Sequence, residues 1–193
     1  DGLTRVEDSP ADLAYVLPDA DFSGYERFVI LEPGVAFRKD WERDYNRDVR
    51  GVSDRVTESD MERIKTGMAE LFLEVFTEEL EDNGYSIVEE AGQDVMILRP
   101  AIINLDVNAP DLGSANRNRS YVASAGSATL YMEFYDSVTG QILARAADFS
   151  EARDWGTFQW ATSVSNRAEA RNVLRGWAEM LVDRLEAIHQ GED

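Results

Sequence analysis

The segment from Gly126 to Asp148, GSATLYMEFYDSVTGQILARAAD, constrains the fold of this chain more than any other. Apolar and polar side chains alternate on both sides of a short stretch, Asp136 to Gly140, which is typical of two antiparallel strands joined by a turn. The apolar face is expected to hold Ala128, Leu130, Met132, Phe134, Ile142, Ala144 and Ala146, and the opposite face Thr129, Tyr131, Glu133 and Tyr135. The segment therefore predicts a β-hairpin, and it contains no recognisable catalytic motif.

Three further segments are predicted to be strands. Phe28 to Leu31 is a short buried strand, and the Pro33-Gly34 pair that follows predicts a bulge or turn that redirects the chain. Tyr85 to Glu89 is a second short strand. In the long segment Asp94 to Asn108, Pro100 predicts a sheet edge or a bulge. Apolar residues occupy alternate positions of this segment at Val95, Ile97, Ala101, Ile103, Leu105 and Val107.

Two segments are predicted to be amphipathic helices. Thr57 is expected to cap the first, because acidic residues follow it where the helix dipole favours negative charge. Its apolar stripe begins at Met61, and Asn83-Gly84 is expected to end it. The second helix is expected to begin at Asn166, with Glu169 three residues later as in a capping box.

These elements predict an α+β fold with two layers, in which a mixed, largely antiparallel sheet of about five strands has two amphipathic helices packed on one face. Residues 25–190 are expected to form this single domain, because a chain of 193 residues can bury a core of its own. Residues 1–24 are polar and are predicted to form an extended arm laid across the domain. Residues 38–56 lack a sustained period and are predicted to form a long loop or a strand extension.

Composition argues against several classes of function. The chain carries 38 acidic and 19 basic residues, a net charge of −19, so nucleic acid is not expected as a partner. It has no cysteine, and its one histidine, His189, is expected in a frayed and solvated last helical turn. Thiol chemistry, transition-metal sites and Ser-His-Asp hydrolysis are therefore disfavoured, and no cofactor is predicted. No apolar run approaches the roughly 20 residues that span a bilayer.

Two aromatic patches are candidate binding sites. Trp155, Phe158 and Trp160 lie in a segment that resembles a loop, and they either form a platform for a sugar or protein partner or close the open end of the core. Trp41 and Tyr45 form a second patch among basic residues, although neighbouring acidic residues offset that charge.

Carboxylates are the remaining chemical candidates. Asp148 and Asp154 could act as a pair in a hydrolase or polymer-binding site, or they could simply pair with nearby arginines. Asp106, Asn108 and Asp111 have the spacing of oxygen ligands for calcium, yet Pro110 occupies a ligand position and strand-end capping explains them as well.

Four segments taken together resemble a known family. They are YVLPDADFSGYERFVILEPGVAF, DVMILRPAIINLDVNAPD, GSATLYMEFYDSVTGQILARAAD and RGWAEMLVDRLEA, and in this order they resemble the Gram-negative envelope lipoproteins of domain of unknown function 3313. The resemblance implies an exported protein on the periplasmic side of a membrane, with a signal peptide and a lipid-bearing cysteine just before Asp1. Residues 1–24 would then be a tether. The family implies no activity and no catalytic residues.

The leading expectation is a non-enzymatic envelope lipoprotein domain that binds an envelope protein or self-associates, through the sheet edge near Pro100 or the aromatic loop. The alternative is a carbohydrate-binding or envelope-polymer-binding protein, or a carboxylate-dependent hydrolase. A third interpretation makes the acidic charge an adaptation to salty surroundings.

Overall fold

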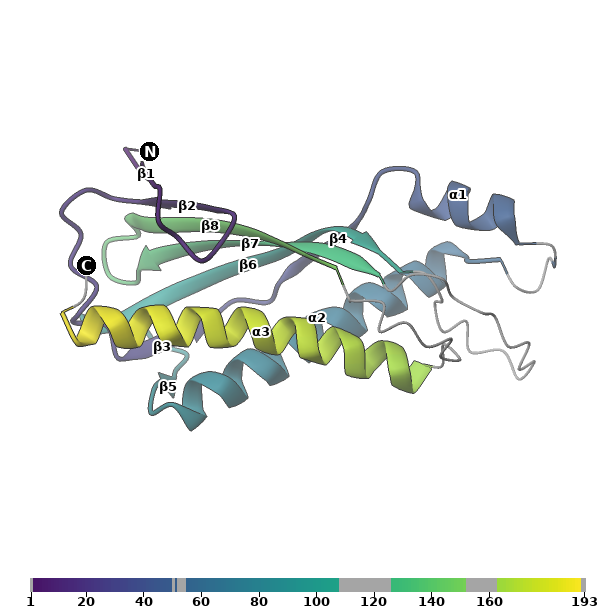
Figure 1. The fold of residues 1–193 in the computed structure, drawn as a ribbon. Coiled ribbons are helices and arrows are strands. Elements are labelled where there is room, and N and C mark those ends of the chain that lie inside the picture. Colours follow the sequence, from purple (N-terminus) through teal and green to yellow (C-terminus); the bar gives the residue numbers. More distant parts are fainter. Residues whose placement is uncertain (1, 50, 52–54, 108–125, 152–162, 192–193) are drawn as a thin grey trace.

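The computed structural model describes residues 2–49, 51, 55–107, 126–151 and 163–191 (Figure 1). This part of the chain contains the strands β1 (Thr4–Val6), β2 (Leu13–Val16), β3 (Arg27–Ile30), β4 (Gly34–Phe37), β5 (Ser86–Ile87), β6 (Val95–Asp106), β7 (Ser127–Asp136) and β8 (Ile142–Glu151). It also contains the helices α1 (Trp41–Asp48), α2 (Glu58–Asp82) and α3 (Ser163–His189).

The strands form one mixed sheet in the order β1-β2-β8-β7-β6-β3-β5. Neighbours from β1 to β6 along this order are antiparallel, whereas β3 and β4 both pair in parallel with β6. Helices α2 and α3 pack against each other and lie beneath the sheet, on the same side of it (Figure 1). The core lies between these two layers and includes Phe72 and Phe76 of α2 and Trp177 of α3. The predicted α+β class and mixed sheet are confirmed.

The sheet has eight strands, so the prediction of about five was wrong. Two of the additional strands, β1 and β2, come from the predicted arm, and β2 pairs with β8 from Leu13 opposite Ala147 to Val16 opposite Ala144. The third, β4, follows the Pro33-Gly34 pair and continues along β6. In three or four residues alternation is a weak signal, so strands this short can be recognised in one place, as at Phe28 to Leu31, and missed in another, as at β1, β2 and β4.

A third helix, α1, occupies part of the segment predicted as a loop or strand extension. Its eight residues carry charges on most positions, and only Trp41 and Tyr45 give it an apolar side. A helix of eight residues is not stable alone, so packing against the rest of the protein decides its conformation.

Most of the β6 residues that face the core are not members of the alternating apolar set seen in the sequence. Met96, Leu98 and Ile102 are each at most 1% exposed and belong to the core. Ile103, by contrast, is 36% exposed on the other face. A register shift after Ile103, where Asn104 has a φ of 52°, returns Leu105 to the core. The strand is apolar on both faces, so periodicity could not choose between them.

Pro100 lies in an inner strand, not at a sheet edge. β3 pairs with β6 up to Leu98, and β4 pairs from Ala101 onwards. Pro100 therefore falls between the two parallel partners, where a residue without an N–H interrupts neither of them.

The predicted hairpin and helix ends are largely confirmed. Asp136 accepts hydrogen bonds from the N–H groups of Val138 and Thr139, at 3.2 and 2.7 Å, and Gly140 has the positive φ of 68° that the turn requires. An irregularity after Phe134 places Ile142 opposite Tyr135, so that Leu143 enters the core in place of Ile142. A Cβ on Gly126 would collide with the carbonyl oxygen of Asp106, which explains the glycine at this strand entry.

Both long helices appear as expected, with one difference in length. Thr57 and Asp60 form a reciprocal capping box at the start of α2. Helix α3 begins at Ser163, three residues before the predicted start. His189 is not simply solvated, because its Nδ1 lies 3.3 Å from the hydroxyl of Tyr85 and the two rings stack.

Candidate interaction surface

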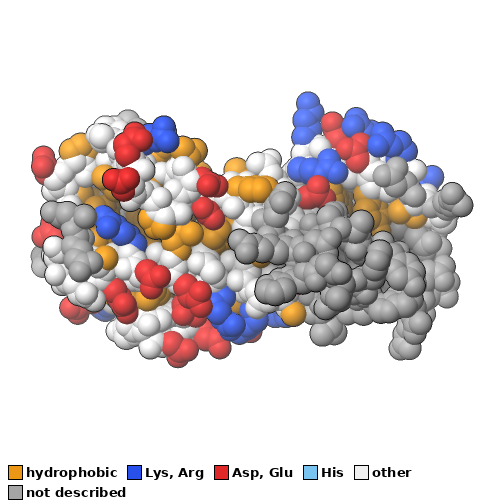
Figure 2. All heavy atoms as spheres, in the orientation of Figure 1, with side chains coloured by type: hydrophobic (Ala, Val, Ile, Leu, Met, Phe, Trp, Pro, Cys, Tyr) orange, Lys and Arg blue, Asp and Glu red, His pale blue; other side chains and the backbone are white. Residues whose placement is uncertain are grey.

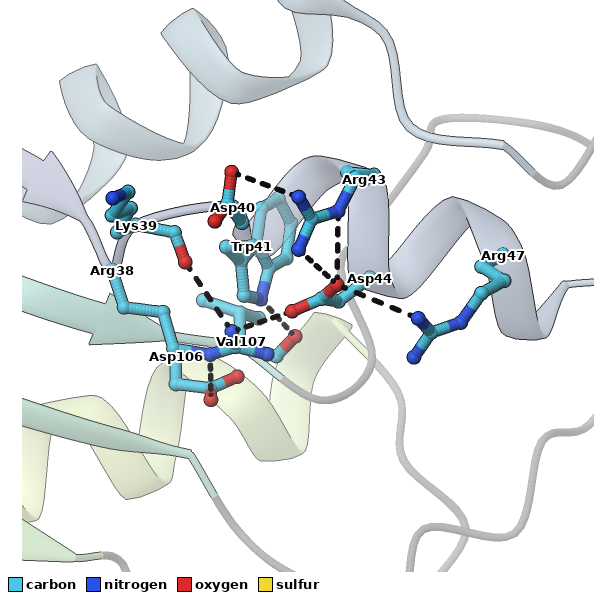
Figure 3. Close-up of polar contacts among 9 residues, drawn as sticks. All are labelled: Arg38, Lys39, Asp40, Trp41, Arg43, Asp44, Arg47, Asp106 and Val107. Atoms are coloured by element: carbon cyan, nitrogen blue, oxygen red, sulfur yellow. Dashed lines mark hydrogen bonds and ion pairs between the residues drawn. The ribbon is translucent and has the colours of Figure 1, made fainter.

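Trp41, a predicted binding residue, is only 2% exposed and fastens α1 to the sheet (Figure 3). Its ring stacks on Phe37 at 4.3 Å and on Tyr45 at 5.6 Å between centroids. Its Nε1 donates to the carbonyl oxygen of Val107 at 3.3 Å. The side chain therefore presents almost no surface to a ligand in this conformation.

Asp106, a predicted calcium ligand, is engaged by an arginine. The Nε of Arg38 donates to the Asp106 carboxylate at 2.5 Å, and its Nη1 donates to Asp44 at 3.1 Å (Figure 3). Hydrogen bonding to Arg38 lowers the pKa of Asp44. Asn108 and Asp111 lie outside the described residues, and no group of three or more metal-ligating side chains occurs within the described ranges.

Asp148 points toward the helical layer and has two hydrogen-bond donors. One carboxylate oxygen accepts from Trp177 Nε1 at 2.8 Å, and the other accepts from the backbone N–H of Asp12 at 3.2 Å. In return, Asp12 accepts from the N–H of Phe149 at 2.9 Å. This clamp ties the N-terminal segment to β8 and α3. Trp155, Phe158, Trp160 and Asp154 lie outside the described residues.

The sheet face opposite α2 and α3 is a surface that the site predictions missed, and it is called the open face here. It carries the odd-numbered residues of β7, namely Thr129, Tyr131, Glu133 and Tyr135, with Arg99 of β6 and Arg145 of β8 directly across from Glu133. Three large apolar side chains on it are notably exposed, with Leu13 at 42%, Ile103 at 36% and Phe149 at 51%. No described helix covers this face (Figure 1).

Glu133 lies at the centre of the open face and is nevertheless buried, at 8% exposure. Its carboxylate accepts hydrogen bonds from the hydroxyls of Tyr131 and Tyr135, both at 2.8 Å. Arg145 donates to it from Nε and Nη2 at 3.2 and 3.1 Å, and Arg99 donates from Nη1 at 3.3 Å. The four neighbouring side chains cover the carboxylate and satisfy it.

The electrostatics of this cluster follow from burial and hydrogen bonding. Burial alone would raise the pKa of Glu133, but the hydrogen bonds from Tyr131, Tyr135 and Arg145 outweigh it, so the pKa is lowered. Burial, followed by the hydrogen bond to Glu133, raises the pKa of Tyr131 to about 12. Glu133 is therefore an anion at neutral pH, and Tyr131 a neutral donor.

The charge is distributed unevenly over the molecule. Figure 2 shows acidic side chains gathered over the helical layer, while acidic and basic side chains alternate over α1. A shallow cavity of about 340 Å³ lies between Pro10 and the α3 residues Gly176, Glu179, Met180, Asp183, Arg184 and Ala187. Its lining combines acidic, basic and apolar side chains, so it suggests no particular ligand chemistry.

One signal in the sequence could have identified the open face. The polar side of the predicted hairpin contains two tyrosines around one glutamate, whereas an ordinary solvated face would carry Lys, Glu or Thr. Arg99 and Arg145 could not be assigned to the same cluster, because their positions depend on the register of β6 and β8.

None of the described helices has a stretch long and apolar enough to cross a membrane.

Comparisons with known proteins give one family match and several distant structures. A family model described as "Protein of unknown function (DUF3313)" matches residues 1–181. The comparison with curated proteins finds no match.

Three of the similar solved structures illustrate how remote these matches are. A PDZ domain protein from Parabacteroides distasonis is 11% identical with a TM-score of 0.43; the match covers 89% of this chain but only 34% of that chain. The PelC dodecamer from Paraburkholderia phytofirmans is 10% identical with a TM-score of 0.42, over 92% of this chain and 96% of that chain. A minor lipoprotein from Acinetobacter baumannii is 12% identical with a TM-score of 0.30, over 84% and 92%.

Proposed function

The chain belongs to the DUF3313 family of proteins of unknown function, and we propose that it is a non-enzymatic cell-envelope domain that binds another protein, or assembles, through the open face of its sheet. The proposal of an envelope location, lipid-anchored on the periplasmic side of a Gram-negative membrane, is supported by the family resemblance of the sequence.

The observation that supports the binding role is that β6 is apolar on both faces. Met96, Leu98 and Ile102 are covered by the helical layer. Ile97, Ala101 and Ile103 occupy the other face, where Ile97 pairs across the ladder with Tyr135 and Ala101 with Tyr131. Strands with apolar side chains on both faces are normally covered on both. A partner protein would provide the second cover.

The composition of the open face supports the same role. Tyrosine, arginine and phenylalanine are enriched at protein interfaces, and glutamate, aspartate and lysine are depleted there. The central rows of the open face contain Tyr131, Tyr135, Arg99 and Arg145, and the one carboxylate among them, Glu133, is buried. On a chain with 38 acidic residues this local composition is unusual.

The hydrolase alternative has less support. A paired-acid mechanism would need Asp148 free to act on a substrate, and that carboxylate is held by Trp177 and the backbone of Asp12. Polymer binding by Trp155 and Trp160 stays a prediction.

Crosslinking in envelopes of the native host tests the proposal. Because the chain has only the two lysines Lys39 and Lys65 but 38 acidic residues, a carbodiimide that activates carboxylates is the suitable reagent. We expect a reproducible adduct larger than the monomer, which is lost in Phe149→Ser and retained in Val138→Ser. Val138 is the matched control, since it is 61% exposed and lies in the β7–β8 turn, outside the open face. A pattern of monomer alone, or equal loss in both variants, would contradict the proposal.

The location is tested separately. Metabolic labelling of the full precursor with an alkyne-bearing palmitate should label the protein, and externally added protease should cleave it in spheroplasts but not in intact cells. Cleavage in neither preparation would place it elsewhere.

A further inference from the structure

Five residues form one straight line across five strands of the open face. Arg5 pairs with Tyr15, Tyr15 with Arg145, Arg145 with Glu133, and Glu133 with Arg99. Residues that are directly opposite in a ladder place their side chains on the same face, so the five side chains are neighbours. This set, Arg5, Tyr15, Arg145, Glu133 and Arg99, is called the arginine row.

The arginine row leaves positive charge exposed on an acidic protein. Its one carboxylate, that of Glu133, already accepts hydrogen bonds from two tyrosine hydroxyls and from Arg145 and Arg99. The side chains of Arg99 and Arg5 are 65% and 54% exposed, and within the described ranges Arg5 has one ion-pair contact, at 3.9 Å with Glu7. The row therefore carries more cationic than anionic groups, whereas the whole chain has a net charge of −19.

Apolar rows lie directly beside the arginine row. In the next row, Leu13 pairs with Ala147, Ala147 with Tyr131, and Tyr131 with Ala101. One row further, Thr129 pairs with Ile103 and Phe149, two of the three exposed apolar residues of the open face. Charge and apolar surface are thus arranged in adjacent parallel stripes.

We propose that the occupant of the open face is an acidic protein segment, whose carboxylates pair with Arg99 and Arg5 while its apolar side chains pack on Leu13, Ile103 and Phe149. This inference rests on the proposed function and specifies the chemistry of the partner. Glu133 already holds Arg99 and Arg145 in place, so less side-chain freedom is lost when a carboxylate binds. Arginine is the residue suited to such pairs, because its planar guanidinium binds carboxylates in a bidentate manner.

A protein segment fits these stripes better than other anions. A polyanion would gain from many clustered cations, and the row supplies three in a chain of net charge −19. An anionic membrane is flat, whereas a sheet of this size is twisted and would contact it over a small area. Repulsion between two acidic proteins is largely screened beyond about 8 Å at physiological salt, so it does not prevent local pairing.

Site-specific photocrosslinking in the native host tests the inference. The photoreactive residue p-benzoylphenylalanine replaces Phe149 in the full chain, and the crosslinked segment of the partner is identified by mass spectrometry. We expect a protein adduct whose crosslinked segment carries carboxylates, with the yield falling about tenfold or more in Arg99→Gln, as for an interface hot spot. Arg99→Glu should lose the adduct too, and replacing the partner's carboxylate by lysine should restore it.

The controls separate the inference from loss of folding and from the proposed function. The same photoreactive residue at Val138 should give no such adduct, and the circular dichroism of Arg99→Gln should match that of the unchanged protein. An adduct that is indifferent to Arg99→Gln, or one formed with lipid, polysaccharide or a second copy of this chain, would overturn the acidic-segment inference and leave an envelope-binding role standing. If the photoreactive residue at position 149 gave no adduct at all, both the acidic-segment inference and the proposed function would be contradicted.

Discussion

At the scale of single residues, Glu133 shows how a carboxylate can be buried on the side of a sheet that faces away from the core. Burying a charge is unfavourable unless hydrogen bonds and opposite charges replace the lost water. Two tyrosines two positions before and after it on β7, and two arginines on the flanking strands, supply these groups. The local sequence provides the tyrosines, and the sheet provides the arginines.

We predict that Glu133→Gln lowers the free energy of unfolding by about 2 to 4 kcal/mol, because two arginines and two tyrosine hydroxyls lose their common anionic acceptor. Urea denaturation followed by circular dichroism measures the change. Glu62→Gln is the control, since Glu62 is exposed and forms a surface ion pair with Lys65, and the substitution should cost less than about 0.5 kcal/mol. Equal effects of the two substitutions would show that the cluster does not stabilise the fold.

At the scale of elements, the N-terminal segment is part of the sheet and does not lie loosely over it. β2 pairs with β8, and the N–H of Leu17 donates to the carbonyl oxygen of Leu143 at 2.7 Å. The Asp148 carboxylate accepts from the backbone N–H of Asp12, and the Asp12 carboxylate accepts from the backbone N–H of Phe149. The edge it forms is short, because β1 has only three residues. Short edge strands protect a sheet against pairing with other chains.

We predict that deletion of residues 1–17 makes the protein aggregate, because it exposes the edge of β8, a strand of ten residues. Size-exclusion chromatography with light scattering detects this outcome. The matched control is deletion of residues 1–3, which removes no strand and should leave the protein's size distribution unchanged. A monodisperse, stable product of the longer deletion would mean that β1 and β2 are dispensable.

At the scale of the whole molecule, ion pairs and hydrogen bonds stabilise the ionised form of several acidic side chains. Arg171 bridges Glu74 of α2 and Glu78 of the same helix, and so links α3 to α2. Hydrogen bonding to Arg171 is the largest cause that lowers the pKa of Glu74, and hydrogen bonding to Arg27 does the same for Asp94. Hydrogen bonds from Thr139 lower the pKa of Asp136 in the hairpin turn.

We predict that the melting temperature falls as pH drops below about 4.5. The ordinary pKa values are 3.8 for Asp94 and 4.5 for Glu74, and both are lowered in the folded chain. Between the ordinary and the lowered values the unfolded chain binds more protons, so protonation favours unfolding and the stabilisation present above this window is lost. Calorimetry from pH 7 to pH 3 measures the effect. A melting temperature that rises to pH 3 would show that relief of charge repulsion dominates instead.

The ends and periods of the long elements could be predicted because they depend on neighbours in the sequence. Thr57 caps α2 with Asp60, and Gly140 closes the hairpin turn, through contacts within three or four residues. Two of the short elements that were not predicted depend on distant contacts: α1 depends on the packing of Trp41 on Phe37, and β2 depends on β8, which lies more than 120 residues away. For the candidate site, the sequence placed Tyr131, Glu133 and Tyr135 together on one face of the hairpin. It could not place Arg99 and Arg145 beside them, because their positions depend on strand pairing.

The sequence alone determined the α+β class, the hairpin, the two long helices and the family, because each follows from local periodicity, capping or a run of matching residues. It also determined that nucleic acid is a poor partner, since net charge does not depend on the fold. Only the tertiary structure decided which face of β6 enters the core, because that strand is apolar on both. Only the register of three strands brought Arg99, Glu133 and Arg145 into one row, because pairing across a sheet is set by hydrogen bonds between distant segments.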